Sequence, residues 1–196
     1  MITIGIELNH VVRDINKQIV KYYAKEFDPS IDIEEVDKSD DVLSTTCKFE
    51  SKHARNNFLY IDYPYEIFGC ASTVEKNLST KITSWLSDIE NIEDEDIRII
   101  FYSLDEEALT IQSTYFFLSK IGTRVRKVFF PKSIQEIWED CDLVITANKE
   151  VVEYANDNSL KAVLIKRKLN EGCKAELSYD NLSDVIDDEE FFNKVK

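Results

Sequence analysis

Polar side chains that could do chemistry stand at the ends of three short apolar stretches of the sequence. Glu7, Asn9 and His10 end or follow the first stretch, Ser103 follows the second, and Thr146 follows the third. A carboxylate can act as a nucleophile or bind a metal ion, a hydroxyl can bind phosphate, and a histidine can act as a base. Whether these groups act together depends on the elements that position the three stretches.

Several of these residues also have a structural interpretation. Ser103 at the end of a strand can bind phosphate, but serine in such a place more often caps a helix. Lys132 follows Pro131 and is expected to be a solvated loop lysine. His10 has no neighbouring Ser or Cys nucleophile in a strained turn, so we expect a capping or surface histidine.

Cysteine and histidine spacing does not indicate a metal site. The chain has four cysteines and two histidines, and none of the cysteines forms a C-x-x-C pair. We therefore expect four reduced and mostly buried thiols, at Cys47, Cys70, Cys141 and Cys173.

Composition excludes some classes of partner. The 196 residues include 38 acidic and 24 basic side chains, which gives a net charge of -14. Proteins that bind nucleic acid or anionic lipid use Lys and Arg to neutralise phosphates, so we predict no specific nucleic acid and no membrane as partners. No apolar run is long enough to span a bilayer, and the N-terminus does not resemble a signal peptide. We expect a cytoplasmic protein that is not secreted.

The rhythm of apolar residues predicts strands that alternate with helices. Short apolar runs predict strands at residues 2–8, 97–102, 125–130, 143–145 and 162–165. Helical spacing predicts helices at residues 11–27, 74–89, 106–121, 133–139, 149–156 and 182–192. In the first of these helices Arg13 is expected to face outward together with three lysines.

This alternation is typical of an α/β fold with a five-stranded parallel sheet, helices on both faces and the first strand in the centre. The carboxyl ends of parallel strands meet at one edge of the sheet, where such folds bind ligands. We therefore expect the polar residues at the three strand ends to line one crevice.

Residues 28–71 are less regular than the rest. We predict a small cap-like insertion there and a core domain made of residues 1–27 and 72–196. The aromatic-rich part of the insertion, FLYIDYPYEIF, can either pack the cap onto the core or form an interface with a protein partner. The candidate interface residues are Phe58, Tyr60, Tyr63, Tyr65 and Phe68.

Four segments resemble the motifs of the haloacid dehalogenase (HAD) superfamily. They are IGIELNHVV at the first strand, IIFYS ending at Ser103, the region of Lys132, and EDCDLVITAN ending at Asn148. Within the superfamily the chain is most similar to the 5′(3′)-deoxyribonucleotidase group, and LIKRKLN resembles the last core strand of that group. The resemblance covers residues 1–9 and 74–170, with only a loose match over 30–70. It implies a HAD-like, Rossmann-type core with a cap.

The same resemblance implies a phosphatase site from which this sequence departs. In the family, a first-motif Asp attacks phosphorus, a second Asp two residues later moves protons, and a fourth-motif Asp helps to hold Mg²⁺. The matching positions here hold Glu7, Asn9, Thr146 and Ala147. Ser103 and Lys132, which match the phosphate-binding members, are retained.

These departures lead to a main functional hypothesis and two alternatives. The main hypothesis is a chain that is not an enzyme: a catalytically inactive HAD-like structural module in a homo- or hetero-oligomeric protein assembly, with no cofactor and no metal. Its composition and altered motifs resemble tail proteins of crAss-like phages, which suggests a virion component. One alternative is an active Mg²⁺-dependent nucleotidase-like phosphatase that uses Glu7. The other is a regulatory module that binds a nucleotide through Ser103, Lys132 and cap aromatics.

Overall fold

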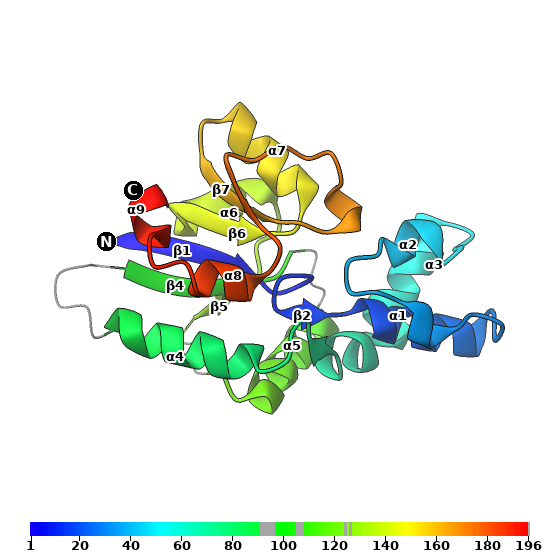
Figure 1. Cartoon of the computed structure of the whole chain (residues 1–196). Helices are drawn as coiled ribbons and strands as arrows, with labels where there is room; N and C mark the ends of the chain where they lie inside the picture. The colour runs from blue at the N-terminus through cyan, green and yellow to red at the C-terminus, as the bar shows by residue number, and fades with distance from the viewer. Residues whose placement is uncertain (91–96, 105–107, 124, 126, 196) are drawn as a thin grey trace.

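A parallel β-sheet forms the centre of the molecule (Figure 1). The computed structural model describes residues 1–90, 97–104, 108–123, 125 and 127–195. The sheet has six strands in the order β5-β4-β1-β6-β7-β8, and every neighbouring pair is parallel. The strands are β1 (Ile2–Glu7), β4 (Ile97–Tyr102), β5 (Val128–Phe129), β6 (Leu143–Thr146), β7 (Lys161–Ile165) and β8 (Leu177–Tyr179).

Strand β1 lies inside the sheet, between β4 and β6, and is buried on both faces. Every residue from Thr3 to Glu7 is buried, as expected for a strand covered by helices on either side. Glu7 pairs in register with Tyr102 of β4, and Ile6 pairs with Ile145 of β6. The register therefore brings the carboxyl ends of β1, β4 and β6 to the same edge.

The prediction of an α/β fold with a parallel sheet is confirmed, but the number of strands is corrected from five to six. The additional strand, β8, has three residues, and its central Ser178 is exposed. So short and half-polar a segment has no apolar run that would predict a strand.

Helices cover both faces of the sheet, as predicted. In Figure 1, α6 and α7 lie on one face, whereas α4 and α5 lie on the other. The helices are α1 (Asn16–Glu26), α2 (Val42–Thr45), α3 (Lys52–Asn57), α4 (Leu78–Glu90), α5 (Ala108–Ile121), α6 (Ile134–Asp140), α7 (Lys149–Asp157), α8 (Leu182–Ile186) and α9 (Phe191–Val195). The first residues of the helix predicted from 106, and residue 126 of the strand predicted at 125–130, lie outside the described residues.

Three predicted elements differ from those observed. The helix predicted over 11–27 begins only at Asn16, because Arg13 and Asp14 form the short strand β2 (Arg13–Asp14), which pairs antiparallel with β3 (Ser72–Thr73). The last helix is divided into α8 and α9. Of the strand predicted at 125–130, only Val128–Phe129 is a strand among the described residues. Residues Phe58–Asp62 and Tyr65–Gly69, for which no element was predicted, form two π-helices.

The segment between α1 and β3 is built from short helices and turns. Two short π-helices are η2 (Phe58–Asp62) and η3 (Tyr65–Gly69). Two 3₁₀-helices are η1 (Ile33–Glu35) and, after β7, η4 (Lys168–Asn170). In Figure 1, α2 and α3 lie beside α1 at one end of the molecule. The division into a cap at 28–71 and a core at 1–27 and 72–196 stays a prediction.

Among the described helices, none combines the length and apolar character needed to cross a bilayer.

Candidate functional site

Glu7 is the carboxylate at the centre of the strand-end edge. It is 5% exposed, and its Oε2 atom accepts hydrogen bonds from Thr146 Oγ1 at 2.6 Å and from the Ala147 backbone N–H at 2.9 Å. Both donors lie next to Glu7 because β6 ends beside the end of β1. Two donors on one oxygen fix the plane of the carboxylate and therefore the position of Oε1.

Tyr102 and Ser103 stand on the other side of Glu7, at the end of β4. Both are fully buried. The Tyr102 hydroxyl approaches Thr146 without reaching hydrogen-bond geometry and has no partner among the described residues. Burial, and secondly the charge of Glu7, raise the pKa of Tyr102 well above its ordinary value. The Tyr102 hydroxyl is therefore protonated at neutral pH.

Arg13 is the buried cation of this edge, and the prediction that it faces outward is wrong. Its side chain is 0% exposed, because strand β2 turns it toward the core instead of the helix surface. Nε and Nη2 donate to Asn9 Oδ1 at 3.0 and 2.7 Å, and Nη2 also donates to Ser103 Oγ at 3.3 Å. Nη1 donates to Thr114 Oγ1 at 2.7 Å.

Two phenyl rings enclose the Arg13 guanidinium. Its central carbon lies 5.1 Å from the ring centre of Phe68 and 5.5 Å from that of Phe117, distances at which a cation is attracted to an aromatic face. Periodicity did not indicate a buried role for Arg13, since its position fits the polar face of a helix. Asn9 consequently serves to hold Arg13.

His10 is partly buried rather than a surface residue, which corrects the prediction. Its backbone has a φ of 63°, and its Nδ1 has no hydrogen-bond partner among the described residues. Burial, followed by the charges of Arg167 and Arg13, lowers the pKa of His10 to about 4. The imidazole is therefore neutral at neutral pH.

Asn170 and Arg167 connect the segments at this edge by donating hydrogen bonds to backbone oxygens. Asn170 Nδ2 donates to the carbonyl oxygens of Ala147 and Ile165 at 2.8 and 2.9 Å, and Arg167 Nε donates to His10 O at 3.0 Å. The sequence analysis did not identify Arg167. The segment LIKRKLN, which contains both residues and was quoted for the family resemblance, was the available signal.

Two predicted site residues, Lys132 and Asn148, form no direct hydrogen bond to Glu7 among the described residues. Lys132 is exposed, and only its backbone N–H forms a hydrogen bond, to Glu136 Oε2 at 2.8 Å. Asn148 caps α7 by accepting a hydrogen bond from Glu150 N at 2.9 Å.

The residues around Glu7 do not fit a Mg²⁺ site. Mg²⁺ takes hard oxygen ligands in octahedral geometry, with carboxylates to balance its charge. The Asn9 oxygen is already taken by Arg13, and the Thr146 hydroxyl donates to Glu7. No group of three or more His, Cys, Asp or Glu among the described residues could hold a metal ion.

The candidate interface residues divide into buried and exposed members. Phe58 and Phe68 are each 2% exposed, Tyr60 and Tyr63 are half-buried, and Tyr65 is 47% exposed. Phe58 and Phe68 are therefore core residues and are withdrawn from the candidate interface. The role of the remaining tyrosines toward a partner stays a proposal.

Comparisons with known proteins relate this fold to one kind of enzyme. No protein-family model matches the sequence, and no curated protein matches it. Among solved structures, the chain is similar to that of an L-2-haloacid dehalogenase, with a TM-score of 0.54 and 12% sequence identity over 95% of this chain and 98% of that chain. The chain therefore has a HAD-like fold. The narrower resemblances to deoxyribonucleotidases and to phage tail proteins stay predictions.

This similarity also corrects a functional prediction. We expected a chain that is not an enzyme, on the ground that three family carboxylates are replaced. The similar solved structure is named as a dehalogenase and matches nearly the whole chain, so the prediction that the chain is not an enzyme is withdrawn. The sequence argument had assumed that only the family's own set of carboxylates can support catalysis.

Proposed function

We propose that this chain is a hydrolase that acts on a small phosphomonoester, with Glu7 as the nucleophile. The observation that carries the proposal is the fixed Glu7 carboxylate at the carboxyl end of the central strand, held by Thr146 and Ala147. Orienting a nucleophile in this way contributes strongly to catalysis because little freedom is left to lose in the transition state. The buried Arg13 cation at the same edge favours an anionic substrate.

The reaction would proceed in two displacements. A Glu7 oxygen attacks phosphorus, the P–O bond to the alcohol breaks, and a glutamyl-phosphate forms. Water then attacks this anhydride, which releases inorganic phosphate and restores Glu7. Asn9 cannot give a proton to the departing alkoxide, so water must do so. The site therefore favours esters whose leaving group is a weak base, such as aryl phosphates.

A 2-halo acid is a second candidate substrate. The structural neighbour is named for its action on such acids. A halide leaves without needing a proton, which suits a site in which Asn9 replaces an acid. In this case the Glu7 carboxylate would displace the halide from carbon, and water would hydrolyse the resulting ester.

Turnover assays with matched variants test the proposal. Purified protein is incubated with 4-nitrophenyl phosphate, deoxynucleoside monophosphates or L-2-chloropropionate, each with Mg²⁺ and with chelator, and phosphate or chloride is measured. We expect release of phosphate, and a fall by a factor of about 10³ or more in Glu7→Gln, since the nucleophile is removed. The exposed Glu150→Gln serves as the matched control and should keep full activity.

The proposal is wrong if no substrate is turned over faster by the native chain than by Glu7→Gln. Turnover of the halo acid alone would favour the second candidate. Glu7→Asp provides a further check: it moves the carboxylate back by about one C–C bond, so it should lose most of the activity. Unchanged activity in Glu7→Asp would contradict a fixed nucleophile.

A further inference from the structure

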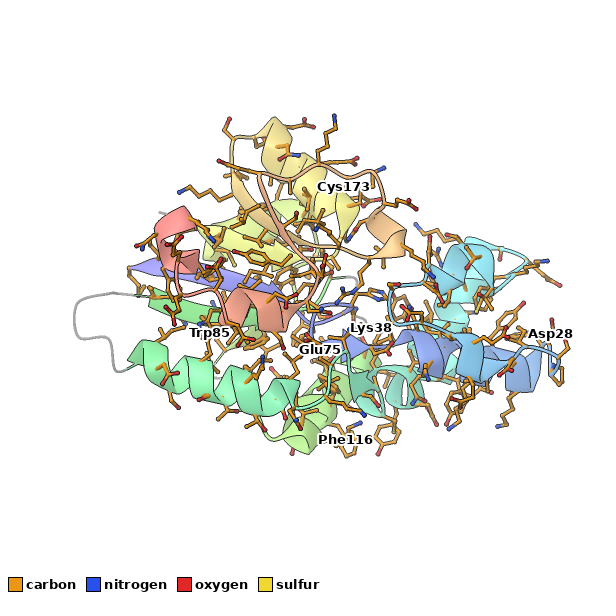
Figure 2. All side chains as sticks on the ribbon, viewed as in Figure 1. Asp28, Lys38, Glu75, Trp85, Phe116 and Cys173 are labelled. Atoms are coloured by element: carbon orange, nitrogen blue, oxygen red, sulfur yellow. The ribbon has the colours of Figure 1, made fainter. Side chains whose placement is uncertain are left out.

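A pocket of about 840 Å³ opens beside the strand-end edge, at the carboxyl end of β7. Its floor includes Leu164 of β7 and Ser178 of β8, which are partners in register and so face the same side of the sheet. The loop of residues 171–175 after η4 forms one wall, and Ser39 forms part of another. In Figure 2, Cys173 of this loop lies close to α7. A volume of this size suits a small organic molecule.

The pocket is cationic in a chain that is strongly acidic overall. Its lining contains Lys166, Arg167, Lys168 and Lys174, whereas Glu171 is the only acidic residue in the lining. Lys166 and Lys168 form ion pairs with Asp180 at 3.2 Å and Asp40 at 2.6 Å, outside the lining. Lys174 has no ion pair among the described residues.

Arg167 is the buried cation among the lining residues, and its guanidinium reaches His10 at the strand-end edge. It is 6% exposed, and its Nη1 donates to the carbonyl oxygens of Lys166 and Asp180 at 2.7 and 2.6 Å. Its Nη2 has no acceptor among the described residues although it is buried. A ligand in the open pocket does not reach this buried atom, so Arg167 adds positive charge near the pocket rather than a hydrogen bond to the ligand.

The pocket also contains apolar surface. Leu164, Ala175 and Cys173 line it together with the methylene stems of the lysines. A ligand that satisfies both features carries an anionic group and an apolar body.

We propose that this pocket binds a small organic anion, whose phosphate or carboxylate group faces Lys174 and whose apolar part rests on Ala175 and the methylene stems of the lysines. Glu7 does not line the pocket, so the ligand occupies a site distinct from the proposed nucleophile. The two sites are connected through Asn170, which lines the pocket and donates to Ala147, the residue that holds Glu7.

Protection of Cys173 from alkylation tests this inference directly. The thiol lines the pocket and is partly exposed, whereas Cys70 is also partly exposed but lies elsewhere and serves as the internal control. Alkylation of both cysteines by iodoacetamide is followed by mass spectrometry of the full chain with four probes: phenylphosphonate, benzoate, inorganic phosphate and benzamide. Phenylphosphonate cannot be hydrolysed like a phosphate ester, so the readout does not depend on turnover.

We expect the two aromatic anions to slow alkylation of Cys173 but not of Cys70, and uncharged benzamide to have no effect. The stronger of the two anions identifies phosphoryl or carboxylate recognition. Lys174→Ala should raise the dissociation constant about three- to tenfold, as expected when one partly exposed charged contact is lost. Lys174→Arg should retain binding, and Lys48→Ala, at an exposed lysine outside the pocket, should not change it.

Two results would overturn the inference: no protection of Cys173 by either aromatic anion, or equal protection by benzamide. Inorganic phosphate alone protecting Cys173 would also contradict it, because the apolar part would then play no role. The binding test and the proposed hydrolysis can fail independently of each other. Glu7→Gln lacks the nucleophile but should bind the probes like the native chain. Conversely, loss of all turnover does not affect the binding result.

Discussion

Asn9 and Arg13 show how one residue pair changes what a strand end can do. The position two residues after Glu7 holds an amide, and that amide accepts two hydrogen bonds from a buried guanidinium. An aspartate there would form a buried ion pair with Arg13. That ion pair would hinder the proton transfer that the HAD resemblance assigns to this position. The amide instead fixes Arg13 without adding charge. An amide neither gives nor takes a proton at neutral pH, so residue 9 cannot act as the acid.

His10 gives a pH-dependent prediction at the same scale. Its pKa in the folded chain is about 4, below the ordinary value of 6.5. The unfolded chain therefore takes up a proton near pH 6.5 that the folded chain takes up only near pH 4. The stability is complete above about pH 6.5 and is lost as the pH falls toward 4. We expect the free energy of unfolding, measured with urea, to fall by about 2 kcal/mol between pH 7 and pH 5.

His10→Asn isolates this effect, because asparagine tolerates the positive φ of this residue. The variant should lose much less stability between pH 7 and pH 5 than the native chain. His53→Asn, at the exposed histidine, is the matched control and should behave like the native chain. Equal pH dependence in the native chain and in His10→Asn would show that folding does not lower the pKa of His10.

At the scale of elements, the sequence predicts the central strands well and the segments around them less well. β4 is predicted with both ends correct, and β6 within one residue, because short and mostly apolar runs favour strands that are largely buried. The start of α1 was predicted too early, since Val11, Val12 and Ile15 fit a helical stripe. The positive φ of His10 and the pairing of Arg13 with Thr73 depend on distant residues, which periodicity does not register.

The residues of the candidate site were likewise predicted only in part. The three strand ends that carry Glu7, Ser103 and Thr146 meet as expected, because parallel strands share one carboxyl edge. Arg13 and Arg167 could not be found in this way, since each acts through contacts with residues far away in the sequence: Arg13 with Thr114, and Arg167 with His10. Polar residues that serve long-range contacts look like surface residues in a single sequence.

Asn16 gives the prediction at this scale, because it connects α1 to the loop that precedes α2. It is 1% exposed, and its Nδ2 donates to three backbone oxygens: Asp37 O at 3.2 Å, Lys38 O at 3.2 Å and Asp40 O at 2.8 Å. Asn16→Asp keeps the shape but turns a donor into an acceptor that faces these oxygens. We expect the free energy of unfolding to fall by about 2–3 kcal/mol.

Limited proteolysis should also find faster cleavage within residues 37–41 in Asn16→Asp. Asn156→Asp is the matched control: this exposed amide donates a single hydrogen bond, to Lys174 O at 2.8 Å, so the change should cost about 0.5 kcal/mol or less. Equal costs for the two variants would contradict the role of Asn16 as a connector.

At the scale of the whole molecule, charge is distributed unevenly. A net charge of -14 repels other anions from most of the surface, so an anionic ligand or substrate is drawn to the few places where cations gather. Two such places lie at the carboxyl ends of the strands: buried Arg13 near Glu7, and the lysines of the pocket beside β7. The parallel sheet explains this coincidence, because its loops meet at that edge. That the acidic remainder keeps the chain away from nucleic acid stays a prediction from composition.

The exposed aromatic pair Tyr65 and Phe116 gives the last prediction, which concerns assembly. The two side chains are 47% and 41% exposed, and their ring centres are 5.0 Å apart. Phe116 projects from α5 away from the sheet (Figure 2), and a Cβ on Gly69 would come within 3.3 Å of both rings. The close backbone approach at Gly69 thus holds the pair rigidly, which lowers the entropy cost of burying it against a partner. We propose that this pair is part of the interface in an assembly. In sedimentation equilibrium, Tyr65→Ala should weaken self-association by about 1–3 kcal/mol, whereas Leu160→Ala, at a comparably exposed leucine beyond α7, should have no effect. A native chain that stays monomeric at its highest soluble concentration, or equal effects of the two variants, would rule this pair out as a contact between copies.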